Sequence, residues 1–77
     1  MNARALIRRI EFNQNIMLGK AVIKGTRLPV EIIVEKIAYG STFEEILIQY
    51  PFIEENDIRA ALLYAAKMLK SEEVYPI

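Results

Sequence analysis

The stretch from Lys20 to Val30 constrains the fold of this chain more than any other segment. It begins with a β-branched pair, Val22 and Ile23, which favours an extended strand. Gly25 permits a turn conformation that other residues rarely adopt, and Pro29 suits the start of a helix while disfavouring helical geometry just before it. The stretch therefore predicts a junction, with strand before it and helix after it.

The segment before the junction, residues 8–24, predicts a short two-stranded β-ribbon. Polar and apolar residues alternate toward Phe12, residues 13–15 have turn chemistry, and residues 21–24 form a second apolar run. A ribbon this short is barely stable in water, so it must pack on the helices or on its copy in a dimer. Residues 1–6 are expected to be frayed or weakly ordered.

The segment after the junction, residues 29–70, predicts three helices. The first spans about residues 29–39 and ends at Gly40, because its apolar residues recur with helical spacing at Val30, Ile33, Val34, Ile37 and Ala38. The second begins at Thr42, whose spacing to Glu45 makes a capping box, and ends at Pro51. The third spans about residues 54–70, with an apolar stripe at Ile58, Ala61, Leu62, Ala65 and Leu69.

These elements give a mainly α fold in one domain, residues 1–77: a short N-terminal β-ribbon (8–24), a three-helix bundle (29–70) and a tail (71–77). The link between the second and third helices has the length of a helix-turn-helix corner. The 77 residues contain neither Cys nor His, so we expect no disulfide, no zinc site, no cofactor and no enzymatic nucleophile–base pair. An apolar fraction of 53% is high for so small a chain and favours a homodimer.

Charge is distributed unevenly along a chain whose formal net charge is zero. Residues 1–27 carry six basic residues and one acidic residue, and residues 28–77 carry four basic and nine acidic residues. These halves can attract each other within the fold, or the basic half can meet a nucleic acid; ordinary solvated charge is the alternative. No apolar run approaches the length that spans a bilayer, so we expect a cytoplasmic protein with no membrane contact.

The third helix carries a candidate DNA-binding face opposite its apolar stripe. At 100° per residue, this face presents Asn56, Arg59, Ala60, Leu63, Lys67 and Lys70. Asn and Arg suit base edges in the major groove, and a small Ala60 would allow close approach. Together with the N-terminal bases, the candidate DNA-binding residues are Asn56, Arg59, Leu63, Lys67, Arg8 and Arg9. The alternatives are a plain solvated face and solubilising charge on an edge strand; acidic residues at the start of the third helix also oppose docking on phosphates.

Two further sets of residues stand out. The motif residues Gly25, Thr26, Arg27 and Pro29 do not fit a nucleotide-binding loop and are expected to stabilise the fold, with Arg27 clamping a carboxylate or helix carbonyls. Several apolar side chains have no evident place in one small core and are candidates for a dimer or partner interface. These are Ile32, Tyr39, Phe43, Tyr64, Met68 and Tyr75.

The run G-K-x-x-I-x-G-T-R-x-P-V over residues 19–30 strongly resembles the prokaryotic family DUF433. Shorter matches follow at 38–40, 43–46, 50–51, 57–58 and 60–62, so the resemblance covers about residues 8–68. It implies a homeodomain-like three-helix fold preceded by a β-ribbon, and membership of the VapB-type antitoxin group, whose relatives are often encoded beside a PIN-like ribonuclease toxin. One departure is Glu54, where the family usually has a Ser or Thr helix cap.

The expected function is therefore that of a non-enzymatic, antitoxin-like regulator. It would dimerise, bind a PIN-like ribonuclease toxin through apolar surface and the tail, and bind operator double-stranded DNA through its helix-turn-helix. The alternative expectation is a dimeric protein–protein interaction module that does not bind DNA. A PIN-like ribonuclease gene next to the gene for this chain would favour the first expectation over the second.

Overall fold

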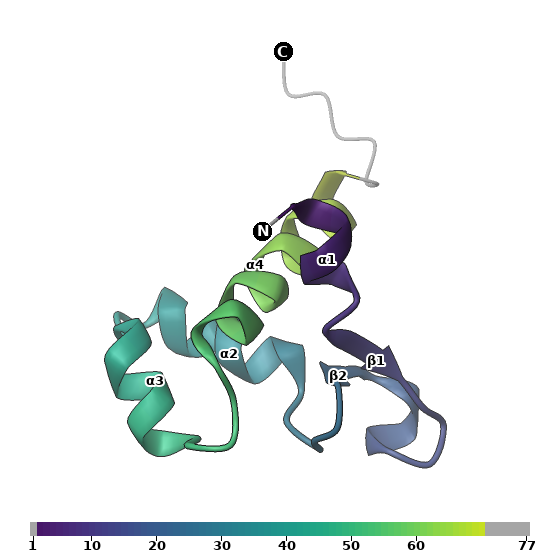
Figure 1. Cartoon of the computed structure of the whole chain (residues 1–77), viewed down its shortest axis with the longest axis horizontal. Coiled ribbons are helices and arrows are strands. Elements are labelled where there is room, and N and C mark those ends of the chain that lie inside the picture. The colour runs from purple at the N-terminus through teal and green to yellow at the C-terminus, as the bar shows by residue number, and fades with distance from the viewer. Residues whose placement is uncertain (1, 71–77) are drawn as a thin grey trace.

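A computed structural model describes residues 2–70 of the chain. Within them the chain is mainly helical, with four α-helices and a small antiparallel sheet near the N-terminus (Figure 1). The elements follow in the order α1 (Ala3–Ile7), β1 (Ile10–Phe12), η1, a 3-10 turn (Met17–Gly19), β2 (Ala21–Ile23), α2 (Val30–Ala38), α3 (Phe43–Gln49) and α4 (Glu55–Lys70).

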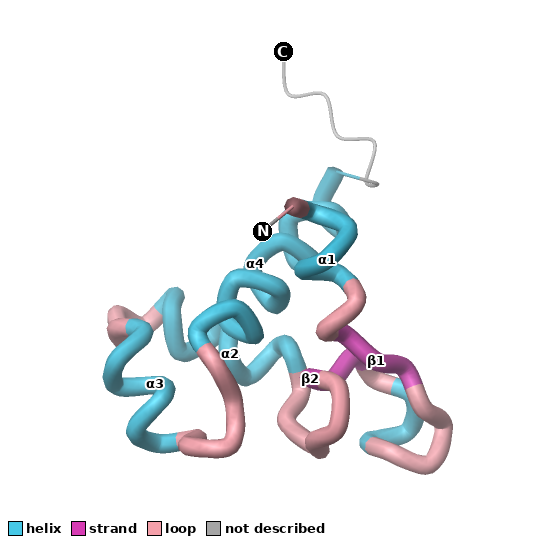
Figure 2. Tube along the Cα trace, in the orientation of Figure 1, coloured by secondary structure: helices cyan, strands magenta, loops and turns pink. Residues whose placement is uncertain are grey.

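The predicted β-ribbon is confirmed, and it is short. Its strands pair antiparallel, with Ile10 opposite Ile23 and Phe12 opposite Ala21, and the loop containing η1 joins them (Figure 2). A single bridge then pairs Val22 with Pro29, so the chain turns back against β2 before α2 begins. This second pairing joins the ribbon directly to the helical part.

The helix ends follow the local signals in the sequence. Pro29 precedes α2 in an extended conformation, and Gly40 follows it with a φ of +99°. The capping box of α3 is formed: the Thr42 hydroxyl accepts from the Glu45 N–H at 3.1 Å, and the Glu45 carboxylate accepts from the Thr42 N–H at 2.8 Å. The orphan N–H groups at this helix start are thereby satisfied by local side chains.

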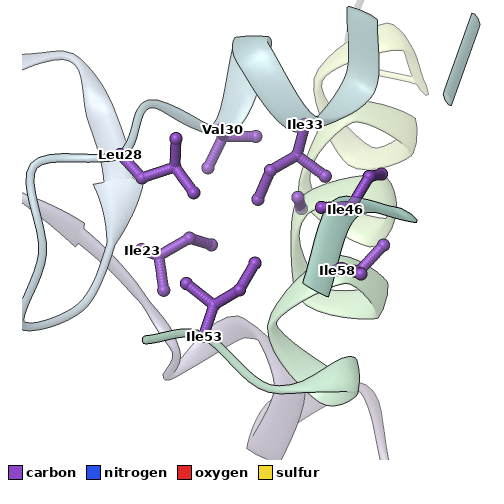
Figure 3. Packing of buried hydrophobic residues seen from close by; sticks show 8 residues of the cluster. Ile23, Leu28, Val30, Ile33, Ile46, Ile53 and Ile58 are labelled. Atoms are coloured by element: carbon purple, nitrogen blue, oxygen red, sulfur yellow. The ribbon is translucent and has the colours of Figure 1, made fainter. Parts of the chain in front are cut away.

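The core lies where β2, the turn after it and the three long helical segments meet (Figure 3). Ile23 from the ribbon belongs to one buried cluster with Ile33 of α2, Ile46 of α3 and Ile58 of α4, and each of these side chains is at most 2% exposed. Burying an aliphatic side chain of this size contributes about 1.5–3 kcal/mol. One residue from each element thus holds the ribbon and the helices together.

Two expectations about packing are wrong. Residues 1–6 were expected to be frayed, but residues 3–6 belong to α1. The Asn2 side chain caps this helix by accepting from the Ala5 N–H at 2.8 Å, and the helix packs on α4 (Figure 1). The buried apolar stripes of α2 and α4 also end earlier than the periodicity indicates, because Ala38 at the end of α2 and Leu69 near the end of α4 are exposed. The predicted tail, residues 71–77, lies outside the described residues.

Candidate functional site

Three of the four motif residues at the junction have structural contacts. Gly25 adopts a φ of +80°, the left-handed region that favours glycine. The Thr26 hydroxyl donates to the Ile23 carbonyl at 2.7 Å and accepts from the Leu28 N–H at 3.0 Å. Pro29 pairs with Val22 and precedes α2. These contacts fix the turn that carries the chain from the ribbon into the bundle.

Arg27, the fourth motif residue, differs from the other three. It is exposed, and within residues 2–70 no hydrogen bond or ion pair involves its guanidinium, so the expected clamp on a carboxylate or on helix carbonyls is not formed there. Arg27 instead lines a hollow of about 650 Å³ together with Ile16, Thr26 and Phe52. The Phe52 ring is 61% exposed, so this hollow combines a cation with accessible aromatic surface.

Arg9 provides the carboxylate clamp that was expected of Arg27. One of its guanidinium nitrogens lies 3.0 Å from the Glu54 carboxylate and 3.0 Å from the Asp57 carboxylate. Hydrogen bonds to Asp57, and then to Glu54, raise the pKa of Arg9 above its ordinary value. This side chain joins the start of the ribbon to the start of α4, so it is not a free phosphate-binding arm.

Asp57 has two roles in this cluster. Its second carboxylate oxygen accepts from the Glu54 N–H at 2.8 Å, and the side chain is almost fully buried, with 8% of the residue exposed. It therefore reaches back from the first turn of α4 to the residue before the helix, as the Glu of a capping box does. Asp57 compensates for the absence of a Ser or Thr cap at Glu54.

The candidate recognition face of α4 is covered in part: Ala60 is buried, whereas Arg59, Lys67 and Lys70 are exposed. Ala60, expected to allow close approach to DNA, is 0% exposed, and α1 packs along this helix, as Figure 1 shows. Asn56 and Leu63 are half-buried. Arg59 is exposed, but its guanidinium pairs with Glu55 at 3.0 Å and lies over the Phe43 ring at 5.4 Å from the centroid. The expectation that Ala60 lies on an open face is therefore wrong, while Arg59 and Lys67 are exposed as expected.

The remaining basic candidates lie beside α1. Arg8 and Lys67 are both exposed, and they line a shallow hollow of about 450 Å³ together with Arg4 and the apolar side of α1. Arg4 and Arg8 are four residues apart, and the hollow brings them together with Lys67, which lies about 60 residues later in the chain. Three cations therefore share one surface.

An apolar groove of about 520 Å³ runs between α2 and α4. It is lined mainly by aliphatic and aromatic side chains of the two helices, with charged side chains on its rim. The apolar lining is Ala21, Val30, Val34, Ala38, Tyr64, Ala65, Met68 and Leu69, and the charged residues are Lys20, Glu31 and Glu35. The Lys20 ammonium pairs with the Glu31 carboxylate at 2.9 Å. An apolar centre with a polar rim is the usual composition of a protein-binding surface.

The candidate interface residues fall into three groups. Tyr64 and Met68 line the groove, and the Tyr64 ring packs against the Phe12 ring with centroids 5.7 Å apart. Ile32 and Phe43 are half-buried and pack against the core, whereas Tyr39 is 85% exposed at the end of α2. Tyr75 lies outside the described residues. The groove therefore unites only two of the six.

One exposed feature has no signal in the sequence. Met17 and Leu18 adopt φ values of 50° and 58°, in the left-handed region, and Gly19 follows with 84°. Leu18 is 91% exposed at this turn. Neither residue type favours positive φ, so turn propensities give no warning of this conformation.

Two classes of site receive no support from the described residues. Within residues 2–70, no three His, Cys, Asp or Glu side chains gather as metal ligands. Among the helices of the same region, none combines the length and apolar character needed to cross a membrane.

Comparison with known proteins gives a family for the chain but no biochemical activity. The family model described as "Protein of unknown function (DUF433)" matches residues 10–65. A crystal structure of a DUF433 member protein from Anabaena variabilis ATCC 29413 is similar, with a TM-score of 0.76 and 28% sequence identity. The similarity covers 87% of this chain and 66% of that protein. A search of curated proteins found no match.

Proposed function

We propose, from the premise that the chain belongs to the DUF433 family, that it is a non-enzymatic, antitoxin-like regulator that binds a PIN-like ribonuclease as a homodimer. The observation that carries the proposal is the exposed Arg27 beside the exposed Phe52. The other motif residues shape the turn, whereas Arg27 has no contact there that would explain its presence.

The hollow at Arg27 has the chemistry of a protein-binding site. Arg and aromatic side chains are enriched among the residues that dominate the energy of protein interfaces. Phe52 offers apolar area, and Ile16 adds a second apolar side chain to the lining of the hollow. The guanidinium donates to a carboxylate in two parallel hydrogen bonds, which fixes orientation as well as affinity. This hollow therefore fits a partner with an acidic group beside an apolar patch.

A metal-dependent ribonuclease is a partner of this kind. Nucleases of this type hold divalent cations with carboxylates, and a protein cation placed among those carboxylates competes with the metal and blocks the substrate phosphate. Arg27 in the hollow would act in this way, while Phe52 would exclude water from the contact. Neutralisation by this route needs no catalytic group on the regulator.

The test is a calorimetric titration of the full chain with the PIN-like ribonuclease encoded beside its gene. We expect Arg27→Ala to weaken binding at least tenfold, since loss of a desolvated charged hydrogen bond costs more than about 1.4 kcal/mol. Arg27→Lys should recover only part of the affinity, because an ammonium lacks the planar fork. Arg4→Ala removes another exposed arginine and should leave affinity unchanged.

Two results would contradict this proposal. One is an unchanged affinity for Arg27→Ala, which would remove the proposed contact. The other is no binding of any neighbouring ribonuclease, which would favour the alternative of a protein–protein interaction module with a different partner.

Operator DNA is a second candidate ligand, supported by the hollow that Arg4, Arg8 and Lys67 share. Phosphates are the natural partners of such a cluster. The burial of Ala60 and the ion pair of Arg59 with Glu55 argue for backbone contacts rather than base readout by α4. In a gel shift with upstream DNA across a salt series, Arg8→Ala should make the salt dependence shallower by about one phosphate contact. No shift at low salt would remove DNA binding from the proposal.

A further inference from the structure

The turn at Met17–Gly19 holds three consecutive residues in left-handed geometry. This conformation is unfavourable for a non-glycine residue, because Cβ approaches the following carbonyl oxygen, and here Met17 and Leu18 both adopt it. Backbone hydrogen bonds hold the turn: the Gly19 N–H donates to the Ile16 carbonyl at 3.1 Å, and the Lys20 N–H donates to the Met17 carbonyl at 3.2 Å. These hydrogen bonds lie within residues 16–20, so the local backbone maintains a conformation that the Met17 and Leu18 side chains disfavour.

The strained turn gives no burial in return within this chain. Leu18 is 91% exposed and Met17 is 42% exposed, so the aliphatic side chain at the strained position remains in water. A residue such as Asn or Gly would make the same turn with less strain. Local strain that brings no internal contact is typical of surfaces used in binding. The exposed Leu18 side chain, called the knob below, is therefore a candidate to insert into an apolar groove, called its socket.

The groove between α2 and α4 provides a socket on the same molecule. Its rim begins at Lys20, only two residues after Leu18, so the two Cα atoms are at most about 7 Å apart. Leu69, which also lines the groove, is 65% exposed. The ion pair of Lys20 with Glu31 neutralises two of the three charged side chains on the rim. Two such surfaces can approach without strong repulsion.

We propose that Leu18 of one copy inserts into the α2–α4 groove of a second copy, and that the second copy's knob occupies the first groove in return. Because knob and groove are neighbours, a two-fold axis between them brings each knob to the opposite groove. This is the self-complementary contact that closed dimers use. The inference rests on the homodimer of the proposed function and assigns its interface.

The test is sedimentation equilibrium of the full chain alone, over a wide range of concentrations. We expect the average mass to rise toward twice the 8.9 kDa of one chain. Leu18→Asn removes the knob, yet Asn tolerates the left-handed turn, so the chain should fold and its dimer should weaken at least tenfold. Leu69→Glu should weaken the dimer from the groove side.

Two further variants make the test specific. Combining Leu18→Lys with Leu69→Glu should restore the dimer relative to either single change, because each knob then carries a charge opposite to its socket. Ile48→Asn is the matched control, since Ile48 is a comparable aliphatic residue, 79% exposed on α3 and outside the groove; it should leave the dimer unchanged.

Three outcomes would overturn the inference: a chain that stays monomeric up to millimolar concentration, a dimer unaffected by Leu18→Asn, or a dimer weakened as much by Ile48→Asn. Because the measurement uses the chain alone, its result is separate from that of the ribonuclease titration. A knob-dependent dimer that binds no ribonuclease would contradict the proposed partner and leave this interface in place.

Discussion

The two turns of the ribbon region make positive-φ geometry in different ways. The turn after β2 uses Gly25, whose φ of +80° carries no side-chain strain, and the Thr26 hydroxyl ties it to the backbone on both sides. The turn between β1 and β2 places Met17 and Leu18 in the same region of backbone space, and its tip is exposed. The turn at Gly25 stabilises the fold, whereas the turn at Met17 and Leu18 exposes the Leu18 side chain to solvent.

This difference separates residues that stabilise the fold from residues that are available to a partner. A motif can be retained because it stabilises a turn, as Gly25 and Thr26 do, and such residues give no indication of a partner. A residue that lowers stability, such as Leu18, or one that has no described contact, such as Arg27, indicates binding to a partner. Four substitutions test this contrast directly.

Thr26→Val should have the largest effect on stability. It keeps the side-chain shape but removes the hydroxyl that donates to Ile23 and accepts from the N–H of the buried Leu28. We expect a loss of about 2 kcal/mol in the free energy of unfolding, or roughly 10 °C in Tm. Urea denaturation measures it, and Thr26→Ser should retain most of the stability. A loss below about 0.5 kcal/mol would mean that the turn does not depend on this hydroxyl.

Gly25→Ala should lower the free energy of unfolding by about 1 kcal/mol, because alanine is strained in the left-handed conformation that Gly25 adopts. No atom lies within 4 Å of the position where the added Cβ would stand, so no steric clash adds to this cost. The same denaturation experiment measures it. An unchanged stability would show that the turn relaxes to another conformation, and the contrast with the Leu18 turn would then lose its basis.

Leu18→Asn should raise stability by about 0.5–1 kcal/mol, measured at concentrations low enough for the chain to be monomeric. Asn tolerates the left-handed region better than Leu does, and the exposed Leu18 has little burial to lose. Leu18→Ala is the control, because it removes the knob without relieving the backbone. If Asn and Ala have the same effect, strain at this turn is not significant.

Arg27→Ala should change stability least, by less than about 0.5 kcal/mol, because the side chain is exposed and has no described partner. Thermal unfolding of the full chain measures it beside the Thr26 variants. A loss above about 1 kcal/mol would return Arg27 to the structural group with Gly25 and Thr26. It would also remove the reason for assigning Arg27 to a binding surface.

Sequence reasoning identified the elements whose signals are local. The capping box at Thr42, the stop at Gly40 and the Pro29 start of α2 are each defined by residues within a few positions of one another, and all three appear in the structure. Helical spacing also placed Ile33 and Ile58 in the core. The mainly helical fold with a small ribbon follows from these signals.

Which surfaces of these elements are covered, and which stay exposed, depends on contacts between residues far apart in the sequence. The clamp of Arg9 on Glu54 and Asp57 joins residues 45 and 48 positions apart, and no local pattern indicates that pairing. Ala60 was expected on an open face of α4, but its side chain is fully buried, whereas Arg59 and Lys67 of the same face remain exposed. The strained geometry of Met17 and Leu18 likewise opposes their own preferences. Local sequence determines the elements because capping and periodicity act over a few residues. Exposure and ion pairing depend on which distant elements meet, and it is exposure and ion pairing that define the candidate sites.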